Sequence, residues 1–263
     1  MRLLVLLTAL AMPIVAWLCN TGAFGPDNGT ISDRYPTLLV AAGYAFSIWS
    51  IIFLLDAAYA VWQATGRRRD EPTLGRIAPW AAAGFLLTTI WMPLFSQQRF
   101  WACLLVIFGA LVCLLRCAVW LSRDTTPTKG QWGWAWLPLS LHAGWLSLAA
   151  FLNLAQVVVA YELAPVDRQL PWSLALFTLA AAMLLVLNHR MRGNVAFAAA
   201  ALWALAAVYV KQSGHGLAGA DIAAWTALAI AALLLAQTVL LRRRHGGGWL
   251  PAPAVGHGSL RAG

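Results

Sequence analysis

Charged side chains are scarce in this chain. Only 10% of its 263 residues are Asp, Glu, Lys or Arg. A soluble domain carries about 25% charged residues, so this composition excludes a soluble protein held by a small membrane anchor. The connections between apolar stretches are also short. Connections such as Ser122–Trp136 leave no room for a separate soluble domain.

Sequence signatures of common catalytic sites are missing as well. The chain contains no Gly-x-Ser-x-Gly, no His-Glu-x-x-His and no glycine-rich phosphate-binding loop. Its four cysteines indicate no disulfide framework, and Cys113 and Cys117, one helical turn apart, are interpreted as packing residues rather than a soft-metal site. No acid–base pair has a convincing spacing. We therefore expect a non-enzymatic protein that requires no cofactor or metal.

Long apolar stretches are what the chain has in abundance, since 61% of its residues are hydrophobic. A helix of about 20 apolar residues crosses a hydrocarbon core ~30 Å thick. The sequence therefore predicts an all-α integral membrane bundle of about eight transmembrane helices. The predicted spans are Leu3–Cys19, Leu38–Ala64, Ala78–Phe95, Phe100–Leu121, Leu137–Tyr161, Trp172–Asn188, Val195–Val210 and Ile222–Leu241.

The basic residues alternate between the two sides of these predicted spans. Fourteen of the 18 Lys and Arg residues fall on one side, and only Arg34, Arg99, Arg168 and Lys211 fall on the other. Because cytoplasmic loops carry the excess of Lys and Arg, both termini are predicted to be cytoplasmic. Topology and anionic lipid headgroups also explain the net charge of +9, so no nucleic-acid partner is expected.

Several polar side chains fall at membrane depth, where they are costly and therefore mark candidate functional positions. Asp56 lies in the second predicted span, seven residues after a tryptophan on the same helical face. His142, Asn153 and Gln156 lie in the fifth span, and His142 is three residues before Trp145. Two interpretations remain open for these side chains. Either they line a ligand cavity, or they hydrogen-bond between helices. For Asp56, close to the predicted cytoplasmic end of its span, a side chain that reaches the membrane interface is a further alternative to a buried role.

The chain contains 15 tryptophans, which is a high number. Most fall near predicted span ends, where indole is typical of the membrane–water interface. Four fall within or close to spans two to five and are candidates for an aromatic cavity: Trp49, Trp91, Trp101 and Trp145.

Three motifs in these spans resemble those of one known family. The first motif is a proline, a Phe or Val stretch and Trp-x-x-Leu-Tyr, which resembles Pro36 and the run that ends in Trp49-Ser-Ile-Ile-Phe53. The second is Asn-x-x-Trp-x-Pro-x-Phe, which resembles Thr88-Thr-Ile-Trp91-Met-Pro93-Leu-Phe95. The third is Trp-x-x-x-Ala/Thr-x-x-Leu-Asn, which resembles Trp145-Leu-Ser-Leu-Ala149-Ala-Phe-Leu152-Asn153. The family is that of the tryptophan-rich sensory proteins, also called TspO, MBR or translocator protein. The resemblance covers Ile31–Asn153 and, by position, the first span, and it is similar to a longer bacterial branch.

The resemblance implies a five-helix bundle with a pocket between its helices, roofed by the loop after the first helix, here Thr21–Thr37. We therefore expect a TspO-like membrane core at residues 1–161, three additional transmembrane helices at 162–244 and a disordered cytoplasmic tail at 245–263. The expected location is a bacterial inner membrane.

The family binds porphyrins and other hydrophobic ligands, so the resemblance implies a porphyrin, haem or sterol-like partner besides membrane lipids, with a homodimer left open. The expected ligand-binding residues are Trp49, Thr88, Trp91, Trp101, His142, Trp145, Ala149 and Asn153. Thr88 stands where the family has Asn, and His142 where it has Tyr. An imidazole is a good ligand for haem iron, so His142 is a candidate axial ligand; the competing interpretation is a hydrogen bond to Asp56 or to a backbone carbonyl.

Three functions are weighed on this basis. The first is a membrane receptor or sensor that binds a porphyrin-like tetrapyrrole in an aromatic pocket. The second is a transporter of tetrapyrroles or lipids, which would favour discontinuous helices or internal repeats. The third is an enzyme that modifies the bound tetrapyrrole.

Overall fold

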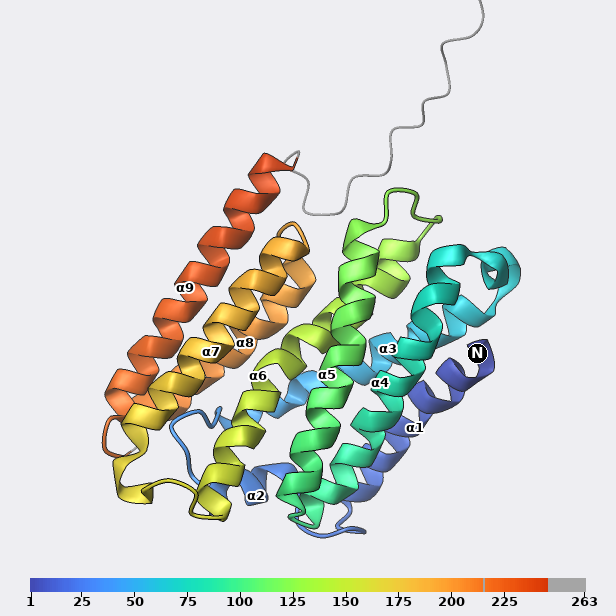
Figure 1. Cartoon of the computed structure of the whole chain (residues 1–263). Helices are drawn as coiled ribbons and strands as arrows, with labels where there is room; N and C mark the ends of the chain where they lie inside the picture. Colours follow the sequence, from blue (N-terminus) through green and yellow to red (C-terminus); the bar gives the residue numbers. More distant parts are fainter. Residues whose placement is uncertain (215, 246–263) are drawn as a thin grey trace, which may run out of the picture.

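The computed structural model describes residues 1–214 and 216–245, and this part of the chain is an all-α bundle without strands (Figure 1). Except for His245, the predicted tail at 245–263 lies outside the described residues. Eight helical spans are long and apolar enough to cross a membrane. The predicted fold class is therefore confirmed, and the chain is a multi-pass membrane protein.

The long helices follow one another with short connections. They are α1 (Arg2–Asn20), α3 (Ile48–Ala64), α4 (Pro72–Ser96), α5 (Phe100–Arg123), α6 (Leu137–Ala160), α7 (Gln169–Arg190), α8 (Val195–Ser213) and α9 (Ala220–Arg244). Shorter elements lie between them: α2 (Asn28–Arg34), the 3₁₀ helices η1 (Gly43–Ser47), η2 (Gly66–Asp70) and η4 (Val166–Arg168), and a π-helical turn, η3 (Trp132–Trp136), that leads into α6.

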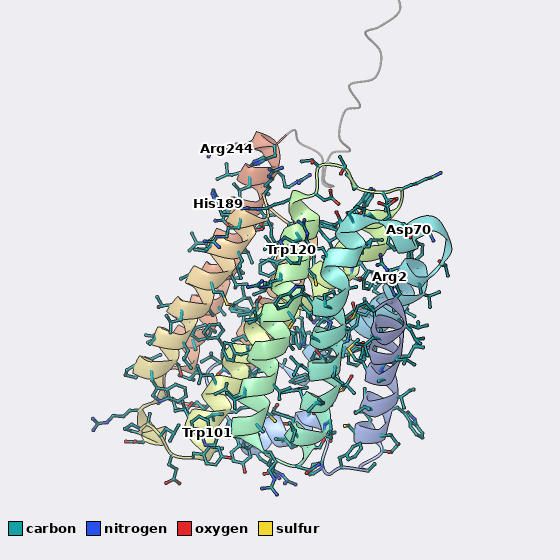
Figure 2. All side chains as sticks on the ribbon, turned by 45° about the vertical axis from the view of Figure 1, so that its right-hand side comes forward. Arg2, Asp70, Trp101, Trp120, His189 and Arg244 are labelled. Atoms are coloured by element: carbon teal, nitrogen blue, oxygen red, sulfur yellow. The ribbon has the colours of Figure 1, made fainter. Side chains whose placement is uncertain are left out.

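The two ends of the bundle differ in charge, as the alternation of basic residues predicts. Arg2, Asp70, His189 and Arg244 lie at one end and Trp101 lies at the other (Figure 2). At the basic end, arginine guanidinium groups lie over indole rings: Arg68 over Trp62, Arg76 over Trp120 and Arg116 over Trp80. Cationic heads above an aromatic belt are typical of a membrane–water boundary.

The second predicted span begins too early. The chain is not helical over residues 38–42, and η1 and α3 begin only at Gly43 and Ile48. Hydropathy alone misplaced this boundary because Leu38–Ala41 is as apolar as a helix and almost entirely buried. Non-helical backbone at membrane depth is tolerated only where other parts of the protein satisfy its polar groups.

Helix α8 supplies those partners. The Ala42 N–H donates to the carbonyl oxygen of Ala207 over 3.0 Å. The Gln212 amide donates to the carbonyls of Thr37 and Val40 at 3.1 and 3.0 Å, and the Trp203 indole donates to the carbonyl of Ala45 at 3.1 Å. The segment before α3 is thus held by a helix from the last third of the chain.

Helices α6 and α8 pack closely at Gly144. A Cβ atom added there would lie 2.3 Å from the carbonyl oxygen of Phe197 and 3.1 Å from the Cβ of Ala200. Small residues let transmembrane helices approach in this way. The division into a core at 1–161 and three additional helices at 162–244 stays a prediction, although α8 contacts α6 and η1 directly.

The predicted lid, Thr21–Thr37, contains the short helix α2. Asp27 caps this helix by accepting hydrogen bonds from the N–H groups of Gly29 and Thr30. Side chains fasten the lid to the bundle: Lys211 to Asp33 (3.0 Å), Gln156 to Ser32 (3.3 Å), Tyr35 to Gln98 (2.9 Å), and Gln169 to the carbonyl of Pro36 (3.2 Å). The lid therefore connects α4–α5, α6, α7 and α8 at one end of the bundle.

Candidate functional site

Trp49 is at the centre of an aromatic cluster contributed by three helices. It lies in the first turn of α3, and its ring is 6.1 Å from that of Trp91 on α4 and 5.9 Å from that of Trp145 on α6. Phe53, one turn further along α3, stacks on Trp49 at 5.1 Å. The predicted convergence of the three indoles is confirmed as geometry, and ligand binding by them stays a prediction.

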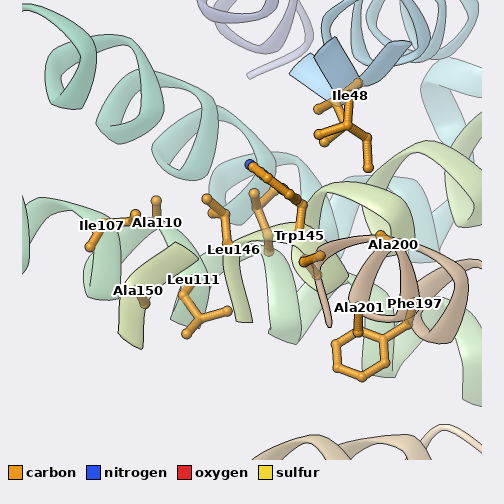
Figure 3. Close-up of a cluster of buried hydrophobic side chains, with 14 of the residues drawn as sticks. Ile48, Ile107, Ala110, Leu111, Trp145, Leu146, Ala150, Phe197, Ala200 and Ala201 are labelled. Carbon is orange, nitrogen blue, oxygen red and sulfur yellow. The ribbon is translucent and has the colours of Figure 1, made fainter. Parts of the chain in front are cut away.

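These indoles surround a small inner cavity. Trp49, Trp91, Trp145, Ala149 and Asn153 all line it, as do Ser32 of the lid and Ala204, Leu205 and Val208 of α8. Figure 3 shows Trp145 among buried apolar side chains of α3, α5, α6 and α8. The cavity volume is about 40 Å³, whereas pockets that hold drug-sized ligands measure roughly 300–1,000 Å³. The inner cavity therefore holds a ligand of that size only if the helices or the lid move apart.

A larger hollow lies on the other side of Trp49, between α1 and α3. This outer cleft has a volume of about 590 Å³. Its walls are mainly apolar and include Trp17, Phe46, Trp49 and Phe53, and its end near the lid carries the polar residues Asn20, Asp27 and Asn28. Phe46 and Trp49 border both hollows, so these two rings form the wall that separates the cleft from the inner cavity.

A chain of polar side chains lies behind Trp49. Asp56 Oδ2 is 2.7 Å from His142 Nδ1, and both side chains are fully buried. His142 Nε2 is 3.4 Å from Thr88 Oγ1, and the Thr88 hydroxyl donates to the carbonyl of Gly84 at 2.9 Å. The His142 ring meets Trp49 edge-on at 5.6 Å and stacks on Phe85 at 6.1 Å. The hydrogen bond between His142 and Asp56, one of the interpretations left open for His142, is present in the structure.

The other polar side chains of α6 also hydrogen-bond between helices. The Trp91 indole N–H donates to Asn153 Oδ1 at 2.9 Å, which fixes one ring of the aromatic cluster. The Gln156 amide reaches Ser32 of the lid. For Asn153 and Gln156 the interhelical interpretation is confirmed, and Asn153 also lines the inner cavity.

Trp101 lies apart from the cluster. Its side chain is half exposed at the end of the bundle opposite to Arg2, where it stacks on Tyr161 at 5.6 Å (Figure 2). Its position, one residue into α5, is that of a boundary tryptophan rather than of a cavity wall. Phe46 and Phe53 take part in the cluster instead. The sequence signal for Phe53 was its spacing of four residues from Trp49, which places both on one helical face.

His142 is not positioned to bind a metal in this arrangement. The ring is 0% exposed and lines neither hollow, and its two nitrogens face Asp56 and Thr88. A carboxylate on the far nitrogen is a common second-shell partner of a metal-binding histidine. The haem-ligand role of His142 stays a prediction, and it requires the ring to leave Thr88 and reach the cavity.

Comparison with known proteins places the chain in a family. A family model described as TSPO-like protein matches residues 2–240. The match runs from α1 into α9, well beyond the residues that carried the resemblance in the sequence, and includes the helices predicted as an extension. No curated protein and no solved structure shows a significant match.

Proposed function

This chain belongs to the TSPO-like protein family, and we propose that it is a membrane receptor that binds a flat, apolar, conjugated molecule of the porphyrin type against Trp49. The observation that carries the proposal is the position of Trp49 between an outer cleft of about 590 Å³ and an inner cavity lined by two further indoles. Stacked aromatic rings suit a flat conjugated ligand, and a few polar groups at one end orient it.

The outer cleft is the proposed entrance. Its volume falls within the range of small-molecule pockets, roughly 300–1,000 Å³, and it opens between α1 and α3 among lipid-facing side chains such as Trp17 and Leu54. Asp27 and Asn28 at its lid end offer polar contacts to the ligand's hydrophilic edge. A sterol-like molecule fits the same cleft by its apolar body, so sterols belong in the test.

The test is a titration of the purified protein in nanodiscs with a metal-free porphyrin, followed by the Soret band and by tryptophan fluorescence. Trp49→Ala is expected to weaken binding about 3–10-fold, because an aromatic contact contributes about 0.5–1.5 kcal/mol beyond its area. Trp225→Ala is the matched control, since this ring is exposed on α9 and borders neither hollow. Equal affinity of the wild type and Trp49→Ala would reject the site.

The same titration separates the two hollows. If the porphyrin stays in the outer cleft, Trp17→Ala weakens binding and Trp145→Ala does not. If the helices open around the inner cavity, Trp145→Ala and Trp91→Ala weaken binding as well. A haem titration beside the metal-free porphyrin, in wild type and His142→Phe, tests whether His142 becomes an iron ligand in the bound state.

A transporter is the second candidate, and one observation favours it. The backbone before α3 is non-helical and buried between the helices, and interrupted helices are typical of transporter sites. Counterflow of a fluorescent porphyrin in proteoliposomes distinguishes the two functions, since a receptor binds the probe without accelerating its exchange across the membrane. The predicted orientation, with both termini cytoplasmic, is tested separately by a reporter fused after Gly263.

A further inference from the structure

The pair Asp56–His142 is unusual for its depth in the bundle. Both side chains are 0% exposed, and the pair bridges the middle of α3 to α6. The chain has nine acidic residues, all in the described part, and Asp56 is the one whose side chain is buried. Ionisable groups inside a membrane are functional candidates by default, and a net charge there is costly. The net charge of the pair depends on how many protons its two side chains hold.

The hydrogen bonds around His142 bear on that number. The Thr88 hydroxyl donates its proton to the Gly84 carbonyl at 2.9 Å, so the oxygen that it presents to His142 Nε2 at 3.4 Å is an acceptor. A hydrogen bond between these two atoms requires the hydrogen to be on His142 Nε2. The contact of 2.7 Å between His142 Nδ1 and Asp56 Oδ2 needs a second hydrogen between its two atoms. A neutral imidazole beside an ionised carboxylate has only one hydrogen for both positions.

The second oxygen of Asp56 indicates where the additional proton resides. Asp56 Oδ1 is buried and has no hydrogen-bond partner among the described residues. An ionised carboxylate would leave part of its charge on this oxygen without a donor, which is far costlier at this depth than an unpaired carbonyl oxygen. The arrangement thus favours a carboxylic acid whose Oδ2–H donates to His142 Nδ1. The whole pair is then uncharged.

We propose that Asp56 and His142 form a proton-binding site at membrane depth, which holds one additional proton and remains electrically neutral at neutral pH. Neither residue lines the two hollows, so the site does not depend on the porphyrin position proposed above, and iron ligation by His142 would compete with it. The edge-on contact of His142 with Trp49 places the site directly behind the aromatic cluster.

Among the described residues, no strong competing charge acts directly on the pair. Tyr59, one turn along α3, and Cys117 of α5 interact electrostatically with Asp56, and both are buried groups that are neutral when protonated. From α4 the pair meets Phe85 and Thr88, which do not titrate. Cys113 interacts electrostatically with Cys117, and Arg2 interacts electrostatically with Tyr59. His142 is the base that acts directly on Asp56.

Infrared spectroscopy of the full chain in nanodiscs tests the proposal. At neutral pH exposed carboxyl groups are already ionised, so a carboxylic-acid C=O band at that pH reports the buried Asp56. We expect this band in the wild type, its downshift in D₂O and its complete loss in Asp56→Asn. Asp221→Asn, which removes an exposed acid at the start of α9, is the control and should retain the band.

A second measurement keeps the test decisive if Asp56→Asn fails to fold. Nitrogen-15 NMR of histidine-labelled wild-type protein reports whether the buried imidazole carries one or two N–H protons. A carboxylic-acid band with a singly protonated imidazole supports the proposal, and so does a doubly protonated imidazole without that band, since either state contains the additional proton. An ionised carboxylate together with a singly protonated imidazole overturns it.

Discussion

Helices α1–α6 and helices α7–α9 bury different kinds of side chain. The first group buries five indoles, Tyr59 and the pair Asp56–His142, whereas the polar side chains buried in α7–α9 are uncharged. The buried apolar side chains of α8 and α9 are mostly alanines. The difference indicates a division of roles in one family fold. The first group carries the candidate site, and α7–α9, above all α8, hold the segment before α3 and the lid in place.

The largest effect is expected from His142→Ala. The change leaves a cavity of aromatic size and removes the partner of Asp56, so the free energy of unfolding should fall by about 3–5 kcal/mol. Thermal denaturation in detergent or nanodiscs measures it. If His142→Ala lowers the free energy of unfolding no more than a substitution in α7 does, the buried pair does not distinguish the two groups of helices.

Gly144→Ala tests the contact between the two groups. The new methyl group would collide with the backbone carbonyl of Phe197, so α6 and α8 must separate, at a cost of about 1–3 kcal/mol. Gly75→Ala in α4 is the control, because no atom lies within 4 Å of the added Cβ. Helix propensity favours alanine over glycine by up to ~1 kcal/mol at such a position. Equal stability of the two variants would show that α8 does not pack closely on α6.

Asn188→Ala should have a smaller effect within α7–α9. The Asn188 amide donates to Gln237 and Thr238 of α9 at 2.8 and 3.0 Å. Hydrogen bonds between transmembrane helices contribute about 0.6 kcal/mol on average and up to about 1.7 kcal/mol. A loss of stability greater than that of His142→Ala, measured by the same denaturation, would reverse the ranking of the two regions.

The smallest effect is expected at the lid. The hydroxyl and the N–H of Thr30 donate to Asp27, and these bonds hold the pKa of its carboxyl below the ordinary value of 3.8. Because the pKa is lower in the folded protein, Asp27 stabilises α2 above pH ~4, and this contribution is lost as the pH falls through the lowered pKa. The protection of the Gly29 and Thr30 amides, measured as the hydrogen-exchange rate relative to the intrinsic rate at the same pH, should fall on acidification in the wild type. In Asp27→Asn the same acidification should change the protection far less.

Part of the candidate site could be predicted because its residues repeat at helical spacing. Trp49, Trp91 and Trp145 each stand in a local motif, and the three motifs fall on the second, third and fifth long spans. Their convergence followed from these motifs and from the resemblance to a known family. Trp101 was misjudged because a tryptophan one residue into a helix has the same local pattern whether it faces lipid or a cavity. Its exposure and its contact with Tyr161 depend on the neighbouring loop.

Hydropathy and charge are local properties of the chain, and for that reason the sequence by itself determined the eight spans and the basic end of the bundle. Which polar atoms contact one another is not a local property of the sequence. Asp56 and His142 are 86 residues apart in the chain, and Ala42 finds its backbone partner at Ala207 in α8. Only the tertiary structure decided that the second span begins late, that the inner cavity is small beside the outer cleft, and that His142 faces a carboxyl group. At membrane depth no water can satisfy a polar group, so the partners that such groups find are supplied by whichever helix the packing brings near.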